Sequence, residues 1–141
     1  MNETMREFIL AGNLAGLALG QSPSLVEEKM GPPTDISASR KPLIYRYGAL
    51  EISFVKGSLY SFTIDLSDPQ HSLPERLEII GWTPQRHTTE TQFRDQMEAW
   101  GIECRLITTL TFGTQKGIQV GRATVVFDLR AEPLIESIHV M

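Results

Sequence analysis

The side chains of this sequence that could hold a metal ion are few and widely separated. The three histidines are His71, His87 and His139, and the single cysteine is Cys104. Metal sites usually place two His or Cys ligands a few residues apart, as in CxxC or HExxH. None of these four residues has a second ligand at such a spacing. We therefore predict no metal site. We expect the histidine side chains to be solvated or hydrogen-bonded at the surface.

A thiol and two carboxylates are the remaining groups with possible chemistry. A nucleophilic Cys104 would need a neighbouring base, and nothing near it in the sequence supplies one, so we expect a buried structural thiol. Asp65 and Asp68 flank Ser67, and paired carboxylates can act as general acid and base. In a turn-forming segment, however, Asp and Ser more commonly form local hydrogen bonds. The sequence thus predicts no catalytic residue.

Phe8–Leu19 is an apolar segment rich in Gly and Ala. It is too short to cross a bilayer as a helix, and the glutamates around Arg6 remove the positive flank of a signal peptide. Gly12, Gly16 and Gly20 recur every four residues, but no Lys-Ser/Thr follows them, so they predict no phosphate-binding loop. We expect a core segment in which these glycines allow close packing.

The composition limits the class of function. The chain has 141 residues, of which 41% are hydrophobic and 21% charged, as expected for one globular domain. Its net charge of −4 argues against nucleic-acid binding, which usually needs a basic patch. An acidic surface instead suits a basic protein partner. A single cysteine cannot form an internal disulfide, so we expect a cytoplasmic protein. We expect neither a cofactor nor a membrane partner.

The first half of the chain predicts two helices followed by strands. Apolar spacing predicts a short helix over Thr4–Ala11. A second helix begins at Pro23, with Ser22 as its N-cap, and ends at Gly31. A polar loop over Ile36–Lys41 follows. Alternating hydrophobicity then predicts three strands: Leu43–Tyr47, Leu50–Phe54 and Leu59–Asp65.

The second half predicts a similar series of elements. Polar and turn-forming residues predict a linker over about residues 67–76, and Leu77–Trp82 has the pattern of a short strand. Thr89 and Gln92 form a capping box that opens a helix over Thr89–Trp100. Four strands are predicted after this helix: Cys104–Phe112, roughly Ile118–Val120, Ala123–Asp128 and Leu134–Val140.

The two halves repeat each other. Gly48–Asp65 and Gly121–Val140 each contain an alternating strand, a short polar turn and a second alternating strand, preceded by a helix that ends in glycine. One such unit could not bury its apolar face alone, whereas two can share a core. We predict a single α+β domain over residues 1–141, with repeats over about 1–66 and 77–141. The two tandem helix–β-hairpin repeats would form one antiparallel sheet with helices on one face.

Strand parity separates a packed face of this sheet from an open, curved face. In the third strand Tyr60, Phe62 and Ile64 alternate with polar residues and are expected to face the core. Six side chains of the first repeat are predicted to share the open face and bind a partner: Arg46, Glu51, Ser53, Ser61, Thr63 and Asp65. Asp128 is expected to join them from the second repeat.

Aromatic side chains offer a second, weaker guide to an interface. Tyr45 and Tyr47 share one strand face, and Trp82 is predicted in a turn. Exposed aromatics often anchor interfaces, but most aromatics in a chain of this size are structural. Trp100 completes the apolar stripe of its helix and is expected in the core.

The segment Leu19–Pro33 (LGQSPSLVEEKMGPP) resembles a known family element. It has the LG-x-S/T-x-x-x-V-x-x-x-x-G-x-P pattern of the small lipoprotein of the outer-membrane β-barrel assembly machine. The duplicated unit is also similar to the β-lactamase inhibitor protein and to bacterial immunity proteins of polymorphic toxin systems. The resemblance implies the fold more than the function. Because a lipobox cysteine and the inhibitor's disulfides are absent from this sequence, it implies neither an outer-membrane role nor β-lactamase inhibition.

We therefore expect a non-enzymatic protein-binding module. In its most specific form this is a cytosolic immunity protein that neutralises a cognate bacterial toxin by occluding its active site, with Glu51 and Asp65 mimicking an anionic substrate or pairing with basic toxin residues. Two alternatives stay open: a scaffold or assembly module of an envelope or cytosolic complex, and an enzyme that acts on a small molecule in the concavity of the sheet.

Overall fold

One antiparallel sheet of eight strands dominates the computed structural model, which describes residues 2–14 and 16–141. In chain order the strands are β2 (Asp35–Ile36), β3 (Leu43–Tyr47), β4 (Leu50–Val55), β5 (Ser58–Asp65), β7 (Cys104–Phe112), β8 (Gln115–Val120), β9 (Ala123–Asp128) and β10 (Leu134–Val140). Their order across the sheet is β2-β3-β4-β5-β10-β9-β8-β7. The two halves of the chain therefore meet at the central pair β5 and β10. The predicted α+β class and the single antiparallel sheet are confirmed.

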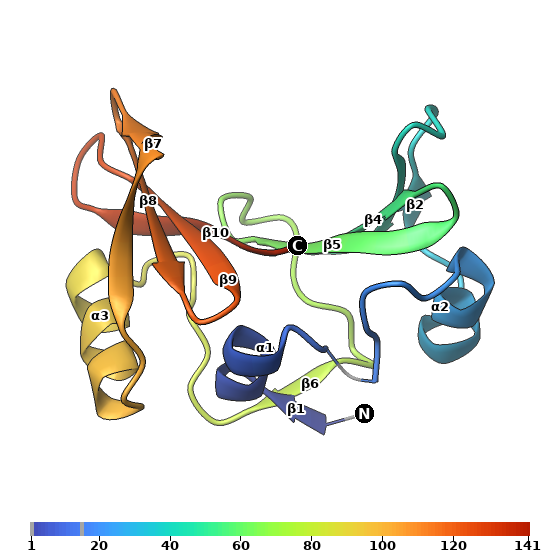
Figure 1. Cartoon of the computed structure of the whole chain (residues 1–141), viewed down its shortest axis with the longest axis horizontal. Coiled ribbons are helices and arrows are strands. Elements are labelled where there is room, and N and C mark those ends of the chain that lie inside the picture. Colours follow the sequence, from blue (N-terminus) through green and yellow to red (C-terminus); the bar gives the residue numbers. More distant parts are fainter. Residues whose placement is uncertain (1, 15) are drawn as a thin grey trace.

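Helices cover only one side of this sheet. The described residues form three of them: α1 (Met5–Ala11), α2 (Pro23–Met30) and α3 (Glu90–Ala99). Both ends of the sheet curve away from the helices, so the other side is open and concave (Figure 1). Within the described ranges, no helix has the length and apolar character needed to cross a membrane.

The helix boundaries follow the capping residues that the sequence predicts. The Ser22 hydroxyl accepts a hydrogen bond from the Leu25 amide, with Pro23 in the first turn of α2. At α3, Thr89 and Gln92 form the predicted capping box, each side chain accepting from the other residue's backbone N–H. These bonds satisfy donors that would otherwise lack partners at each helix start, which explains why both helices begin where predicted.

The core lies between the helices and the inward positions of the strands. Helix residues Phe8, Val26 and Phe93 are fully buried against strand residues of both halves, such as Ile52 and Phe127. Phe93 contacts Phe127 edge-on, with ring centroids 5.8 Å apart. One apolar core therefore serves the whole sheet, as the strand patterns predict.

Most aromatic side chains belong to this core. Tyr45 and Tyr47 are buried, and the Tyr47 hydroxyl donates to the Gly31 carbonyl oxygen at 2.9 Å, which ties β3 to the end of α2. Burial, reinforced by the charge of Glu27, raises the pKa of Tyr47 to about 12. Trp82 packs edge-on against Trp100 at 5.6 Å between ring centroids. The two tyrosines are therefore core residues, whereas the two tryptophans are partly buried against the core.

The N-terminal segment packs against the second half of the chain. β1 (Asn2–Thr4) pairs in parallel with β6 (Glu78–Ile80), which is shorter than the strand predicted over Leu77–Trp82. The Arg122 amide donates to the Ile9 carbonyl oxygen at 2.8 Å, which links the β8–β9 turn to α1. Sequence periodicity did not predict this arrangement, because it carries no information on long-range pairing.

The expected close packing of the three evenly spaced glycines is right only for Gly12. A Cβ atom on Gly12 would lie 3.2 Å from the Val140 side chain. The nearest atom to a Cβ on Gly16 would be 3.8 Å away, and a Cβ on Gly20 would meet nothing within 4 Å. Gly16 and Gly20 are needed instead for their left-handed backbone, with φ of +79° and +93°.

Three strand predictions need correction. Asp35 and Ile36 form the short strand β2, although a polar loop was predicted from Ile36 onward. β8 begins at Gln115, three residues before the predicted start. Tyr60 does not face the core: a register shift between β4 and β5 makes it an extra residue, and it is 53% exposed. The strict alternation assumed for β5 is interrupted by this bulge.

Both edges of the sheet are irregular. β2 contains only two residues. On β7 the pairing with β8 shifts register between Ile107 and Phe112, and the Thr111 hydroxyl donates to the Ile107 carbonyl oxygen at 2.9 Å. The Leu110 side chain folds over Gly117, where an added Cβ would approach it to 2.6 Å. Irregular edges of this kind disfavour the pairing of further strands.

Candidate protein-binding face

All six residues predicted for the open face lie on the side of the sheet away from the helices. Arg46 is opposite Glu51, and Glu51 is opposite Thr63. The alternate positions on these strands, such as Ile52 and Phe62, are fully buried on the helix side. The predicted parity is therefore confirmed for the full set: Arg46, Glu51, Ser53, Ser61, Thr63 and Asp65.

The open face continues into the second half of the chain. His139 on β10 is opposite Thr63, and Thr124 on β9 is opposite His139. Gln119 on β8 and Arg105 on β7 complete the register. A polar row thus crosses the sheet, formed by Arg46, Glu51, Thr63, His139, Thr124, Gln119 and Arg105. The same parity argument, applied to β7, β8, β9 and β10, would have found the residues of its second half from the sequence.

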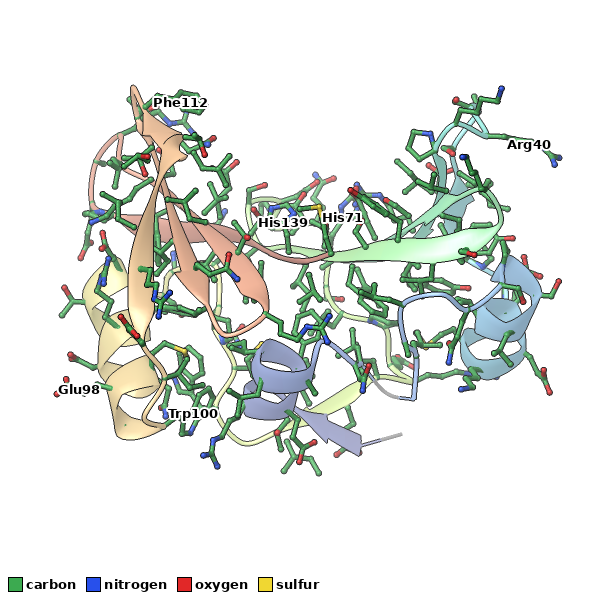
Figure 2. All side chains as sticks on the ribbon, viewed as in Figure 1. Arg40, His71, Glu98, Trp100, Phe112 and His139 are labelled. Atoms are coloured by element: carbon green, nitrogen blue, oxygen red, sulfur yellow. The ribbon has the colours of Figure 1, made fainter. Side chains whose placement is uncertain are left out.

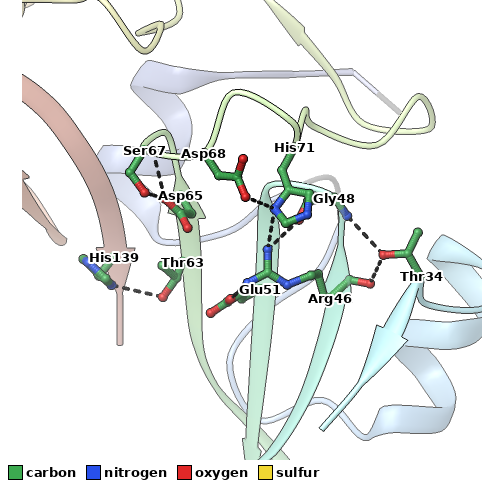
Figure 3. A network of polar contacts seen from close by, with 10 residues as sticks. All are labelled: Thr34, Arg46, Gly48, Glu51, Thr63, Asp65, Ser67, Asp68, His71 and His139. Atoms are coloured by element: carbon green, nitrogen blue, oxygen red, sulfur yellow. Dashed lines mark hydrogen bonds and ion pairs between the residues drawn. The ribbon is translucent and has the colours of Figure 1, made fainter.

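Arg46 is the centre of a polar network at one end of this row (Figure 3). Its guanidinium forms an ion pair with Glu51 across the two strands. The other terminal nitrogen donates to the Gly48 carbonyl oxygen at 3.2 Å and lies 3.0 Å from Nδ1 of His71. Both partners of the ion pair are about a quarter exposed, so the pair is held in a fixed geometry yet remains accessible.

His71 has two competing partners for one nitrogen atom. Its Nδ1 lies 3.0 Å from Arg46 and 3.3 Å from an oxygen of Asp68. A bare Nδ1 accepts from Arg46, whereas a protonated Nδ1 donates to Asp68, so the two contacts exclude each other. His71 therefore links the linker to β3 only when its Nδ1 accepts from Arg46, whereas the bond to Asp68 stays within the linker.

The linker is positioned over the β3–β4 turn by a glycine. The Ala49 amide donates to the Ser72 carbonyl oxygen at 2.8 Å. Gly48 has φ of +62°, and a Cβ atom there would lie 2.1 Å from the same Ser72 oxygen. Only glycine allows this close approach, which places His71 and Asp68 beside Arg46. The sequence predicts the turn and the linker but not their contact.

His139 lies near the middle of the concave face (Figure 2). Its Nδ1 shares a hydrogen bond with the Thr63 hydroxyl at 3.0 Å, and its Nε2 shares one with the Ser137 hydroxyl at 2.7 Å. Burial lowers the pKa of His139, although the charges of Glu51 and Asp65 oppose that shift. The neutral imidazole joins the two halves of the sheet on this face. The predicted hydrogen-bonded imidazole is thus confirmed for His139.

The carboxylates of the open face differ in their partners. Asp65 accepts hydrogen bonds from the amide and the hydroxyl of Ser67, which is the turn predicted from the sequence. Asp128 lies at the end of β9, on the same face of the strand as Thr124, and forms an ion pair with Arg130. Hydrogen bonds from the Arg130 side chain and backbone lower the pKa of Asp128. Of the predicted carboxylates only Asp65 has no arginine partner among the described residues.

The single cysteine is half-buried rather than buried as the sequence predicts. Burial raises the pKa of the half-buried Cys104 thiol, which is the opposite of nucleophile activation. In the described part of the chain, no three His, Cys, Asp or Glu side chains come close enough to hold a metal ion. The open face presents a charge pair and hydroxyl groups on a concave surface.

Comparisons with protein-family models, with curated proteins and with solved structures found no match to this chain.

Proposed function

We propose that the open concave face binds a folded protein, and that the protein acts as a cytoplasmic immunity protein that occludes the active site of a bacterial toxin. The observation that carries this proposal is the polar row, which crosses the sheet on its helix-free side. A concave surface with ordered polar groups fits a convex partner and loses little side-chain entropy when it binds.

We infer that the sheet consists of two tandem helix–hairpin units. Two features support this inference. α2 precedes β2–β5 as α3 precedes β7–β10, and the strand order is the same when read outward from β5 and from β10. Ile64 of β5 is opposite Ile138 of β10 where the units would meet. In such an arrangement each unit supplies one wing of the concave face.

Binding is favoured over catalysis because the polar groups of this face are occupied by one another. Arg46 and Glu51 neutralise each other, and His139 is held by Thr63 and Ser137. A general base or nucleophile would need an atom that is free to contact the substrate. The irregular edges argue against one form of the scaffold or assembly alternative, in which the module would recruit its partners by strand pairing.

Asp65 is the residue of the predicted set best suited to contact a basic toxin surface. Its carboxylate is oriented by Ser67 and has no cationic partner among the described residues. The Arg46–Glu51 pair beside it offers both signs of charge. Charge complementarity of this kind sets the orientation and the rate of encounter.

A survival assay tests the proposed function. The reading frame that neighbours this gene is expressed in a sensitive host with and without this chain, and survivors are counted. We expect the chain to abolish killing, and Glu51→Lys with Asp65→Lys to abolish the protection because the variant presents like charges to a basic toxin surface. Circular dichroism and thermal melting check that the variant folds, and Asp65→Lys alone is the substitute where it does not.

The control carries the same charge change on the other side of the sheet. Glu28→Lys with Glu98→Lys alters two exposed residues on the helices and is expected to protect fully. Absence of killing, or killing that the wild-type chain does not relieve, would contradict the immunity role. Full protection by a folded Glu51→Lys, Asp65→Lys variant would exclude this part of the face.

A further inference from the structure

We propose that a hollow at the β3–β5 end of the open face binds an acidic segment of a partner protein, with Tyr60 as its aromatic anchor. The inference rests on the proposed function for its location and adds the chemistry of the partner. The hollow has a volume of about 680 Å³ and is lined chiefly by Arg40, Lys41, Ser53, Val55, Lys56 and Tyr60. A space of this size holds several side chains.

The charge of this hollow is opposite to that of the chain. Arg40, Lys41 and Lys56 gather there, although the net charge is −4. None of the three forms an ion pair with a carboxylate among the described residues, whereas Arg46, farther along the same face, is paired with Glu51. Three cations without an acidic partner on an acidic protein are complementary to an acidic ligand.

Tyr60 supplies the apolar part of the site. The bulge between β4 and β5 brings it to the hollow, where it is 53% exposed next to the 42% exposed Val55. Tyrosine is one of the residue types most enriched in interface hot spots, and Val55 adds apolar surface beside it. Bulges often reorient a side chain at a functional position. The ligand is therefore expected to carry an apolar residue among its carboxylates.

Lys56 occupies a backbone conformation that lysine seldom adopts. The β4–β5 turn has φ of +53° at Lys56 and +76° at Gly57, and two positive φ angles favour Asn-Gly or Gly-Gly. A lysine at the first position of this turn has a strained backbone, and an asparagine there would be less strained. The positive charge that Lys56 adds to the hollow is a reason for a lysine at this position.

The hollow is continuous with the proposed binding face, since Ser53 and Ser61 belong to both. A partner seated on the polar row can therefore extend a segment into it. A segment of protein fits better than a phosphate group, because Tyr60, Val55 and Pro42 form an apolar lining that a small inorganic anion would not use.

A peptide titration tests this inference without a toxin. The probe is a blocked hexapeptide that alternates Glu and Phe, and the reference probe has Gln in place of Glu. Binding is followed by ¹⁵N chemical shifts at physiological salt. We expect the acidic peptide to shift residues 53–61 and bind at least about fivefold more tightly than the neutral one. Tyr60→Ala should weaken binding about tenfold.

The charge dependence is tested with matched double variants. Arg40→Gln with Lys56→Gln removes two charges from the hollow and should weaken binding of the acidic peptide at least about fivefold. Arg6→Gln with Arg76→Gln removes two exposed charges elsewhere and should leave binding unchanged. Binding that the hollow variant does not weaken, or shifts elsewhere on the protein, would overturn the inference.

The remaining outcomes separate this inference from the proposed function. No shift at millimolar acidic peptide, or equal shifts with inorganic phosphate, would overturn the acidic-segment site. If the hollow variants protect cells fully while Glu51→Lys, Asp65→Lys does not, the inference fails and the immunity role stands. If the peptide binds as expected but no toxin is neutralised, the hollow stands and the immunity role fails.

Discussion

At the scale of single residues, His139 shows how a half-buried polar group can unite two halves of a sheet. The imidazole bonds to Thr63 on β5 and to Ser137 on its own strand, and it lies within the influence of Glu51 and Asp65. Burial nevertheless favours its neutral form. Its parity follows from the sequence, but its contact with Thr63 joins residues that are 76 positions apart along the chain.

The lowered pKa of His139 predicts a pH dependence of stability. Because the unfolded histidine titrates near 6.5 and the folded one lower, the unfolded state binds more protons between these pKa values. The free energy of unfolding should therefore fall as pH decreases below about 6.5. One proton limits the slope to about 1.4 kcal/mol per pH unit, and partial exposure reduces it further.

Urea unfolding from pH 7.5 to 5 measures this slope. His139→Gln keeps a side chain that donates and accepts but does not titrate in this range. The variant should lose less stability than the wild type over the same range. Equal slopes for the two proteins would show that His139 does not contribute to the pH dependence.

At the scale of elements, the β3–β4 turn and the linker act together. The sequence predicts each of them from local patterns, and predicts β3, β7, β9 and β10 with the boundaries that the structure shows. It does not predict that the linker lies on the turn, because the contact depends on a close approach of two backbones. The sequence does not predict the bulge at Tyr60 either, because alternation assumes that each residue of one strand has one partner on the next strand.

Gly48→Ala should destabilise the protein by about 2–4 kcal/mol. The alanine would combine a left-handed backbone with a methyl group 2.1 Å from the Ser72 oxygen, so either the turn or the linker must move. Gly57→Ala is the matched control, because Gly57 has φ of +76° but open space around it. It should cost only about 1 kcal/mol.

Chemical denaturation compares the two variants. A Gly48→Ala protein as stable as Gly57→Ala would show that the contact with Ser72 is not maintained in solution. Loss of the His71–Arg46 contact should accompany the destabilisation, and the chemical shifts of the His71 ring would report it.

At the scale of the whole molecule, the two halves depend on each other in two places. β5 pairs with β10 at the centre of the sheet, and the N-terminal segment crosses to the second half through β1–β6 and the Ile9–Arg122 hydrogen bond. Residues near the N-terminus therefore complete the core around β9 and β10. The predicted shared core follows from the apolar patterns, whereas this exchange of the N-terminal segment requires the structure.

Residues 1–66 and 77–141 should therefore not fold separately. Each fragment would expose a central strand, with buried residues such as Phe62 in the first and Ile138 in the second. We expect poorly dispersed NMR spectra for each fragment alone and recovery of native signals when they are mixed. A fragment that gives a native-like spectrum by itself would show that its half has an independent core.

The irregular edges have a consequence for how the protein behaves at high concentration. Regular sheet edges offer a template on which further chains can add, and repeated addition leads to fibrils. Here one terminal strand has two residues, and the other is interrupted where Leu110 folds over Gly117. Both terminal strands therefore offer little regular backbone with which a strand of a second molecule could pair.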